Sequence, residues 1–412
     1  MRQVSERTLL FLIGAVQAVN ILDFMMVMPM GPFFAEGLGF SLSQVSWLGG
    51  SYTASAAISG IACSFFLDRF DRRRALGLSL LGLVLGTVAG GFATSLHTLM
   101  AARVIAGAFG GPATSVAMSI IADVFPPERR GRALGAVMGA FSVASVFGVP
   151  AGLKLAQLGG WQLPFFGVGA VAFLVTLAVI ALLPPMTGHL ERVQTGPRPS
   201  PLKAVSTPLA ALSLVTTILI FTANFAIVPN IAGYLQNNLG YPANRMDVLY
   251  GAGGAASFLV MQLVGRLVDR FGAPPVATFG AAVYIAILFT VFVTGAAGLP
   301  VLPLFIGFMC AQSFRMVPMN ALTSRVPQPA ERASFMSAQS AAQHLASAGG
   351  AFLSTAFLTE LPDHRLAGMD RVAMLAITLS AVAPALLVTL NRWVLAREAA
   401  AASLKTAAVP VQ

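Results

Sequence analysis

Long apolar stretches separated by short polar segments run along this chain of 412 residues. The stretches are about 20 residues long or longer, and an α-helix of that length crosses the roughly 30 Å apolar core of a lipid bilayer. They lack the alternation of apolar and polar positions that a membrane-spanning strand needs, so helices are expected instead of a β-barrel. We predict twelve spanning helices, over residues 8–33, 45–66, 75–94, 98–121, 133–157, 163–184, 206–230, 245–267, 275–298, 301–324, 333–358 and 371–391.

A segment rich in proline and polar residues, from Pro184 to Pro208, divides the twelve stretches into six and six. Such a composition cannot continue a spanning helix. We therefore predict an all-α membrane protein built as two six-helix bundles. The predicted domains are residues 1–184 and 206–395, joined by a cytoplasmic linker over 185–205 and followed by a cytoplasmic tail over 396–412.

A short charged phrase occurs once in each half of the chain. L-D-R-F-D-R contains Asp68, and V-D-R-F-G contains Asp269 half a chain later. A second pair of phrases, P-P-E-R-R-G with Arg130 and P-Q-P-A-E-R-A with Arg332, has nearly the same separation. Two independent repeats with one spacing indicate that the two bundles are pseudo-symmetric copies, which is the layout of many secondary transporters.

Composition supports a membrane location and excludes several functions. Hydrophobic residues make up 57% and charged residues 10% of the chain, whereas soluble domains carry about 25% charged residues. The net charge of +10 does not indicate nucleic-acid binding, because most of the 25 Lys and Arg residues fall on the termini and on the loops that share a side with them. By the positive-inside rule both termini are cytoplasmic, in a bacterial inner membrane.

The sequence offers no site for nucleotide hydrolysis. Lysine is rare, and no lysine completes the phosphate-binding pattern G-x-x-x-x-G-K-[ST]. We expect neither enzyme activity nor a cofactor, so uphill transport would draw on an ion gradient. The expected partners are a small-molecule substrate, protons and the lipid bilayer, with the chain acting as a monomer.

The repeated charged phrases, together with two further motifs, resemble those of the major facilitator superfamily. The resemblance covers nearly the whole length of the chain. The loop around Asp68 is similar to the family's signature G-x-x-x-D-R-x-G-R-R, with Ser64 and Asp71 in place of the two glycines. The stretch A-A-R-V-I-A-G-A-F-G-G, which contains Arg103, is similar to a second family pattern. The phrase G-V-P-A-G resembles the glycine–proline motif of the family's exporters, which implies helix bending or close packing at Gly148, Pro150 and Gly152.

The resemblance also implies a role for the repeated charged loops. In the family such a cluster holds the cytoplasmic ends together while the outer side is open. Carboxylates beside arginines at helix ends can form these pairs, although they can equally be solvated topology signals. The residues expected to form the latch are Asp68, Arg69, Arg72, Asp269 and Arg270.

Two charged residues fall inside the predicted spans of the first half. Counted at about 1.5 Å per residue, Asp23 and Arg103 lie at similar depth in the outer half of the membrane. Charges there are costly unless they are paired or face water. We predict that Asp23 carries or gates a coupling proton and that Arg103 tunes it. A permanent ion pair between two helices and direct binding of a cationic substrate are the alternatives.

Polar residues at helical spacing indicate the wall of a central cavity. Any one of them can also be an interhelical hydrogen bond. Arg315 has no obvious carboxylate at its depth, so it is expected either to meet substrate in the cavity or to anchor helix packing. The candidate cavity residues are Gln17, Asn20, Tyr52, Asn224, Arg315, Gln339, Gln343 and His344.

The predicted function is proton-coupled export of a small organic compound, a drug or a metabolite, by alternating access. Methionines near residue 25 could suggest a soft-metal path, but they lack cysteine or histidine neighbours, so no metal site is predicted. Export of a sugar, lipid or metal ion on the same fold remains an alternative. A non-transporting membrane sensor and a passive channel are alternatives of other classes.

Overall fold

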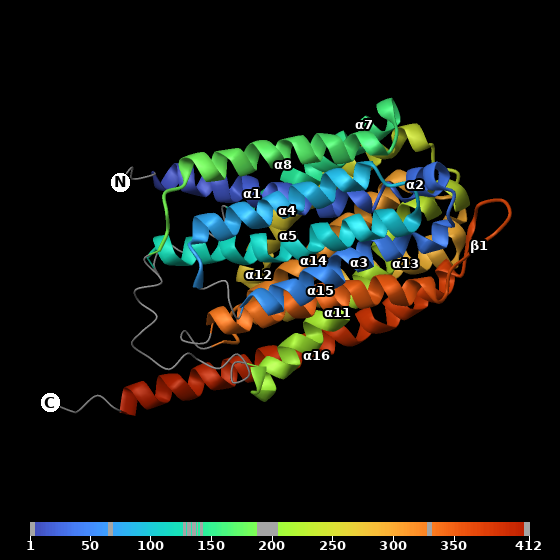
Figure 1. Ribbon diagram of the computed structural model, residues 1–412. Helices are drawn as coiled ribbons and strands as arrows, with labels where there is room; N and C mark the ends of the chain where they lie inside the picture. Colours follow the sequence, from blue (N-terminus) through green and yellow to red (C-terminus); the bar gives the residue numbers. More distant parts are fainter. Residues whose placement is uncertain are drawn as a thin grey trace.

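In the computed structural model the chain is a bundle of long helices that run side by side (Figure 1). The structure describes residues 5–64, 69–126, 143–187, 205–327 and 332–407, together with 129, 133, 137, 139 and 140. Both termini lie at one end of the bundle, here called the termini end. A two-stranded antiparallel hairpin lies at the opposite end, here called the hairpin end; it is formed by β1 (Thr359–Glu360) and β2 (Leu366–Ala367).

The first half of the bundle covers the chain up to residue 187. Side-chain caps begin several of its helices: Ser5 accepts a hydrogen bond from the Thr8 N–H, and Ser95 forms a capping box with Thr98. The elements are α1 (Glu6–Val27), α2 (Gly31–Leu38), the 3-10 turn η1 (Leu42–Gln44), α3 (Val45–Ser64), α4 (Arg72–Gly91), α5 (Leu96–Val124), the π-helix η3 (Ala144–Gly148), α7 (Val149–Gly159) and α8 (Gln162–Leu182).

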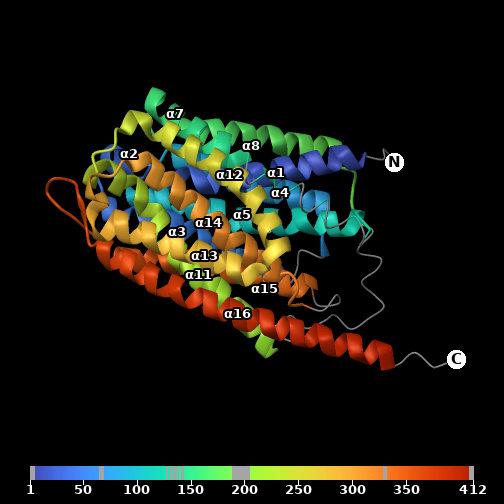
Figure 2. The ribbon, with the colours of Figure 1, turned by 180° about the vertical axis from the view of Figure 1, so that it is seen from behind.

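The second half starts at residue 205, and much of the predicted linker falls outside the described residues. Figure 2 shows its helices α12, α13 and α14 from behind. The elements are α11 (Pro208–Gly233), the π-helix η4 (Tyr234–Asn238), η5 (Ala243–Arg245), α12 (Met246–Phe271), α13 (Ala273–Leu288), the π-helix η6 (Phe289–Val293), η7 (Gly295–Gly298), α14 (Val301–Thr323), α15 (Arg332–Thr355) and α16 (Met369–Ala407).

Each of the twelve predicted stretches overlaps a helical segment, so the all-helical prediction is confirmed. The first stretch is not one helix: α1 ends at Val27, a turn carries Pro29, and α2 begins with Pro32 near its amino end. The last helix continues well past the predicted end at residue 391. The Arg325–Glu398 ion pair holds this extension against the end of α14, and a run of alanines favours helix there.

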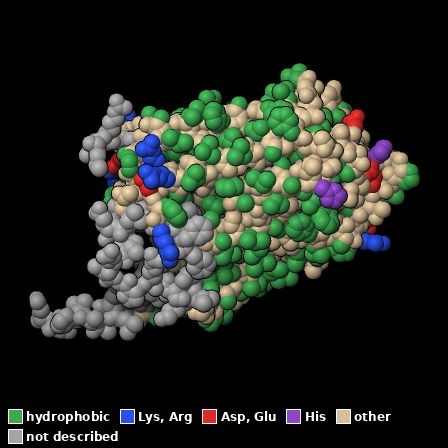
Figure 3. Space-filling view, in the orientation of Figure 1, with side chains coloured by type: hydrophobic (Ala, Val, Ile, Leu, Met, Phe, Trp, Pro, Cys, Tyr) green, Lys and Arg blue, Asp and Glu red, His purple; other side chains and the backbone are tan. Residues whose placement is uncertain are grey.

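Nine helical segments in the described part of the chain are long and apolar enough to cross a membrane. The helices α3 and α15 are not among these nine, although both cover predicted spans. They are richer in small and polar residues, and they pack along one another across the two halves. Apolar side chains cover the flank of the molecule in Figure 3, while charged side chains gather toward its two ends, as expected of an integral membrane protein.

The two halves are joined differently at the two ends. One continuous apolar core links them near the hairpin end, where Phe34 and Leu42 of the first half share it with Ile231 and Leu358 of the second. Toward the termini end each half has its own core: one cluster runs from Leu9 to Leu183, and another lies wholly between residues 210 and 394. The halves are therefore sealed together at the hairpin end and packed separately at the termini end.

Buried hydrogen bonds reinforce this seal. The side chains of Ser46, Asn230 and Ser354, from α3, α11 and α15, bond to one another at 3.0 Å. At the surface, the backbone N–H of Leu42 donates to Glu360 of the hairpin at 2.7 Å. We refer to these five residues as the hairpin-end seal.

Candidate functional site

Asp23 and Arg103 form an ion pair in the interior of the first half. The Arg103 Nη1 atom lies 3.0 Å from Asp23 Oδ2, and Nη2 lies 3.3 Å from Oδ1. Asp23 is 0% exposed and Arg103 is 1% exposed. A charge without water needs a partner of opposite sign and hydrogen bonds to all its polar atoms. The predicted pairing of α1 with α5 is thus present in this conformation.

The guanidinium of Arg103 has further partners besides the carboxylate. Its Nη1 also donates to the backbone oxygen of Asp23 at 3.3 Å. Its Cζ lies 5.2 Å from the ring centroid of Phe165 and 5.8 Å from that of Tyr52, within the range of cation–π attraction. Its Nε is buried and lacks a hydrogen-bond partner among the residues that the structure describes. The cation is therefore supported partly by neutral groups.

A fifth helix, α4, contributes Thr87, which the sequence analysis did not single out. The Thr87 hydroxyl of α4 lies 2.7 Å from Asp23 Oδ1 and 2.8 Å from the backbone oxygen of Leu83. Thr87 is 0% exposed. A threonine within an apolar stretch gives no sequence signal of its own, because hydroxyls inside spans commonly bond only to their own helix.

A second polar cluster lies one turn along α1 from Asp23. The Tyr52 hydroxyl donates to Asn20 Oδ1 at 2.8 Å, and Asn20 Nδ2 donates to the Gly110 oxygen at 2.9 Å and to Thr114 at 2.5 Å. Tyr52 and Asn20 are buried. These two predicted cavity residues bond to each other and to α5, so in this conformation they act as interhelical contacts.

Glycines on α5 make these contacts possible. A Cβ atom at Gly107 would lie 2.3 Å from the backbone oxygen of Tyr52, and one at Gly110 would lie 2.6 Å from the Tyr52 hydroxyl. A side chain at Gly107 would push α3 away from α5, and one at Gly110 would displace the side chains of Tyr52 and Asn20. The glycine-rich phrase that follows Arg103 in the sequence therefore sets the distance between the helices that hold the pair.

Three of the other predicted cavity residues have a side-chain oxygen without a hydrogen-bond partner among the described residues. Gln17 and Gln339 are buried, and each has an Oε1 atom without a partner in the described structure. Asn224 is half-buried, and its Oδ1 is likewise without a partner among the described residues. Gln343 and His344 on α15 are half-buried. Their role in binding substrate stays a prediction.

Arg315 lies inside the second half. Its Cζ stands 3.9 Å from the ring centroid of Tyr284 on α13, and its nitrogens donate to Gln312 at 3.1 Å and to Ser380 on α16 at 3.0 Å. It is 2% exposed. These contacts tie α14 to α13 and α16, which favours the helix-packing alternative over a place in a central cavity.

The charged loops at the termini end are only partly described. Asp68 lies outside the described residues. Asp269, Arg270 and Arg69 are exposed, and the Arg270 guanidinium lies 5.2 Å from the ring centroid of its neighbour Phe271. The latch between the halves therefore stays a prediction.

Arg72, the remaining predicted latch residue, has a carboxylate partner within its own half. Its Nε lies 3.2 Å from Asp123 Oδ2 at the end of α5. Asp123 was not predicted as a site residue, because nothing in the sequence shows that the ends of α4 and α5 meet.

The glycine–proline phrase lies where the predicted fifth span changes its helical form. The π-helix η3 ends at Gly148, and α7 follows with Pro150 in its first turn. A Cβ atom at Gly148 would lie 2.6 Å from Leu22 Cδ1 on α1, next to Asp23. Gly152 on α7 faces Met26 on α1. The predicted bending and packing role agrees with this arrangement.

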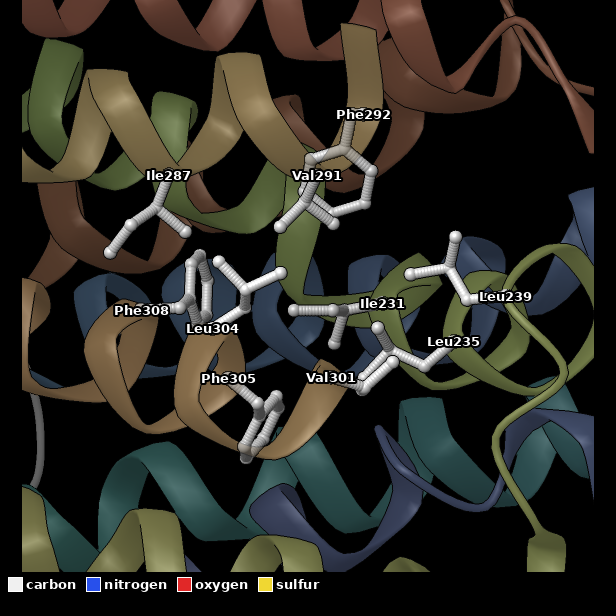
Figure 4. A pocket seen from close by; sticks show the side chains of 10 residues that line it. All are labelled: Ile231, Leu235, Leu239, Ile287, Val291, Phe292, Val301, Leu304, Phe305 and Phe308. Atoms are coloured by element: carbon white, nitrogen blue, oxygen red, sulfur yellow. The ribbon is translucent and has the colours of Figure 1, made fainter. Parts of the chain in front are cut away.

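Two small pockets lie within the second half. Figure 4 shows the larger, about 270 Å³, whose wall is wholly apolar and comes from α11, η4, α13, η6 and α14. Its lining residues are Ile231, Leu235, Leu239, Ile287, Val291, Phe292, Val301, Leu304, Phe305 and Phe308. The smaller pocket includes Arg315 and Pro384. Neither lies between the two halves.

Comparison with known proteins places this architecture in a family. The family model of the Major Facilitator Superfamily matches residues 13–351. The chain is 29% identical over 301 residues to a chloramphenicol resistance protein of Streptomyces lividans, covering 68% of this chain and 75% of that protein. It is 27% identical over 253 residues to a chloramphenicol efflux pump of Mycobacterium tuberculosis, covering 60% of this chain and 59% of the pump. The match to a multidrug resistance protein of Proteus mirabilis is 28% over 267 residues, covering 62% and 66%.

Solved structures share the fold. A D-xylose–proton symporter superposes with a TM-score of 0.74 at 17% identity, covering 92% of this chain and 97% of that one. A bacterial homologue of the lysosomal transporter Spinster, in an inward-facing conformation, gives 0.72 at 18% identity, covering 95% and 98%. The family consists of transporters and not of enzymes. With its paired helical halves and a family match over most of its length, the chain belongs to the Major Facilitator Superfamily and is a secondary transporter.

Proposed function

We propose that this transporter exports a small organic compound in exchange for protons, and that Asp23 carries the coupling proton. The observation that carries the proposal is the fully buried Asp23–Arg103 pair, which links α1 and α5. The next residue on α1, Phe24, packs against Phe225 of the second half. A carboxylate at such a place can bind a proton in one conformation and lose it in another, which an antiporter requires. Three relatives named for chloramphenicol or multidrug resistance support export of an antibiotic-like compound.

The surroundings of Arg103 allow the carboxylate to become neutral. Protonation of Asp23 would remove the compensating charge, which is costly in a dry interior. Arg103 would still donate a hydrogen bond to the backbone oxygen of Asp23 and would still make cation–π contacts with the rings of Phe165 and Tyr52. These neutral supports lower the cost of separating the charges, so a protonated intermediate becomes accessible.

The two ends of the bundle fit a cycle of alternating access. If both termini are cytoplasmic in a bacterial inner membrane, as the basic loops suggest, the hairpin end faces outward and is sealed here. Opening outward would break the hairpin-end seal and close the termini end. The predicted latch of Asp68, Arg69, Arg72, Asp269 and Arg270 would form in that second state. We propose the domain limits given by the sequence as the two moving bodies.

A permanent ion pair is the second candidate role for Asp23. Both carboxylate oxygens are occupied by Arg103 and Thr87, which is what a purely structural pair would show. The same occupancy disfavours direct binding of a cationic substrate, because no carboxylate oxygen is left for it in this conformation. Export of a sugar, lipid or metal ion is supported by no particular contact.

Substrate-driven proton movement in everted vesicles separates these roles. Vesicles would carry wild type, Asp23→Asn, or Asp370→Asn as a matched control, because Asp370 is an exposed carboxylate at the hairpin end. Chloramphenicol and a small set of cationic, neutral and anionic drugs would be added to an established pH gradient. We expect a compound to collapse the gradient with wild type and Asp370→Asn but not with Asp23→Asn. An equal response from all three proteins would make Asp23 structural.

A further inference from the structure

Thr87 has contacts that depend on whether Asp23 holds a proton. Its Oγ1 atom lies 2.7 Å from Asp23 Oδ1 and 2.8 Å from the backbone oxygen of Leu83, and both distances are those of hydrogen bonds. A threonine hydroxyl has a single hydrogen to donate and lone pairs that accept. An ionised carboxylate and a carbonyl only accept. With Asp23 ionised, therefore, Thr87 can complete only one of its two contacts.

A proton on Asp23 Oδ1 satisfies both contacts at once. The protonated Oδ1 then donates to Thr87 Oγ1, and the Thr87 hydroxyl donates to the Leu83 oxygen one turn earlier in α4. Oδ2 remains an acceptor for Arg103 Nη1 at 3.0 Å. When the proton leaves, the Thr87 hydroxyl can rotate and donate to Oδ1 instead, while the Leu83 oxygen keeps its backbone partner in the helix.

We propose that Thr87 is the positioning residue for the coupling proton: it accepts a hydrogen bond from protonated Asp23 Oδ1 and donates one to the ionised form. This inference rests on the proposed role of Asp23. It assigns the proton to Oδ1, on the side of α4, and leaves Oδ2 as the acceptor for Arg103 Nη1 at 3.0 Å. The longer contact from Arg103 Nη2 to Oδ1, at 3.3 Å, then meets a hydroxyl oxygen, which can still accept. Because Oδ1 has a hydrogen-bond partner in either protonation state, the contact adjusts to the proton by rotation of the Thr87 hydroxyl alone.

Few other groups can exchange protons with this site. Among the described residues, the charged and titratable groups that face Asp23 are Arg103 on α5 and Tyr52 on α3. Lys154 on α7 is exposed, and α8 presents the apolar ring of Phe165 to the guanidinium. Tyr52 donates its hydroxyl hydrogen to Asn20 and not to Asp23. The choice of oxygen on Asp23 is thus made by Thr87.

The test measures protonation of Asp23 directly, without transport. Infrared difference spectra of the purified full chain in detergent would follow the carbonyl stretch of protonated carboxylic acids against pH. Wild type, Asp23→Asn, Thr87→Val and Thr87→Ser would be compared. Valine matches threonine in shape and removes the hydroxyl, whereas serine keeps it. Thr87→Ala replaces the valine variant if that one does not fold.

We expect the band that Asp23→Asn removes to shift in Thr87→Val and to keep its position in Thr87→Ser. The protonated state has the additional bond from Thr87 to the Leu83 oxygen, but that oxygen already has its backbone partner in the helix, so the extra bond adds little. The bond from Thr87 to the ionised carboxylate is charge-assisted and stronger, so loss of the hydroxyl disfavours the ionised form more. The pH midpoint of the band should then rise by about 0.5 to 1 unit in Thr87→Val. Unchanged midpoint and frequency in the variants without the hydroxyl would overturn the role of Thr87 while leaving Asp23 as the proton carrier.

A different result would overturn the proposed function itself. If no band that depends on Asp23 appears at any pH at which the protein stays folded, Asp23 does not exchange a proton, and both proposals fall. A midpoint that shifts equally in Thr87→Val and Thr87→Ser would indicate altered packing at α4 and would also reject the hydroxyl as the cause. The serine variant therefore decides between chemistry and shape.

Discussion

The same place in the two halves of this transporter holds different chemistry. In the first half, Asp23 and Arg103 form a buried ion pair. The repeated phrases are separated by 201 residues (269 − 68) and by 202 residues (332 − 130). The first separation makes Asn224 the counterpart of Asp23 in the second half, and the second makes Phe305 the counterpart of Arg103. Asn224 is uncharged, and Phe305 lines an apolar pocket. Both halves therefore have helices at these positions, but only the first half has a charged pair there.

Packing supports this correspondence. In the first half the Arg103 guanidinium approaches the ring of Tyr52. The residue that matches Tyr52 in the second half is Gly253, and a Cβ atom there would lie 2.9 Å from the Phe305 ring. The two helices thus approach each other at the matching point in both halves. The first half has two large side chains there, Tyr52 and Arg103, whereas the second half has one, Phe305, against Gly253. We infer that the proposed proton chemistry belongs to the first half, because the matching residues of the second half are uncharged.

Removing the charges one at a time gives the largest expected effect. Asp23→Leu leaves the Arg103 cation alone in a dry interior, and arginine does not give up its proton, so we expect a loss of about 3 to 5 kcal/mol in stability. Arg103→Leu should cost less, because the remaining carboxyl can be protonated. Thermal unfolding in detergent measures both.

The double variant Asp23→Leu/Arg103→Leu separates pairing from burial. It removes both charges together, and we expect most of the lost stability to return. The matching change in the second half, Asn224→Leu, should cost less than about 1 kcal/mol, because Asn224 Oδ1 has no partner among the described residues. Equal losses from Asp23→Leu and Asn224→Leu would remove the contrast between the halves.

Glycine substitutions compare the packing of the two copies. A Cβ atom at Gly107 would meet the backbone oxygen of Tyr52 at 2.3 Å, where no side chain can move aside. At Gly253 it would meet the Phe305 ring, which can rotate slightly. We expect Gly107→Ala to cost about 2 to 3 kcal/mol and Gly253→Ala about 1 kcal/mol or less. The same unfolding measurement checks the order, and the reverse order would contradict this account of helix approach.

Sequence reasoning reached the features that local composition controls. The twelve helical stretches follow from hydropathy. Charge and depth brought Asp23 and Arg103 to the same level and made their pairing one of the alternatives. Sequence reasoning missed Thr87 and the Arg72–Asp123 pair, because hydrogen bonds between helices depend on which faces meet. For Arg315 the sequence left open a contact with substrate and an anchor for helix packing, because its neighbours on α13 and α16 depend on how α14 turns within the bundle.

Asn224 gives a smaller effect on transport. Its half-buried side chain offers an unpaired oxygen near the interface of the halves. If it bonds to substrate, Asn224→Ala should raise the half-saturating substrate concentration about two- to tenfold, which is the strength of one hydrogen bond. The pH dependence of transport should not change, because the proposed proton site is in the first half. A shifted pH profile would instead place part of the coupling in the second half.

The smallest effect is expected at the surface contact that joins the two unlike halves. Burial alone would raise the pKa of Glu360, but hydrogen bonds from His364, Ser41 and the Leu42 N–H hold that pKa below its usual value. Of these partners, Ser41 and Leu42 belong to the first half, so the part of the lowering that they cause is lost when this end opens. That part contributes to the sealed state above the ordinary pKa of the carboxyl. That contribution disappears as pH falls through the lowered value.

Opening of the hairpin end should therefore become easier in acid, and Glu360→Ala should remove this pH dependence. Water and salt screen the contact, so the gain in opening is about twofold, or about 0.5 kcal/mol. In a variant without Cys63 and Cys310, the rate at which a thiol reagent modifies a cysteine placed at Trp47 reports opening. Trp47 packs against Phe352 across the halves and is partly exposed. If acid changes the modification rate equally with and without Glu360→Ala, Glu360 does not contribute to the pH dependence of opening. The hydrophobic core would then hold the two halves together at this end without help from this carboxylate.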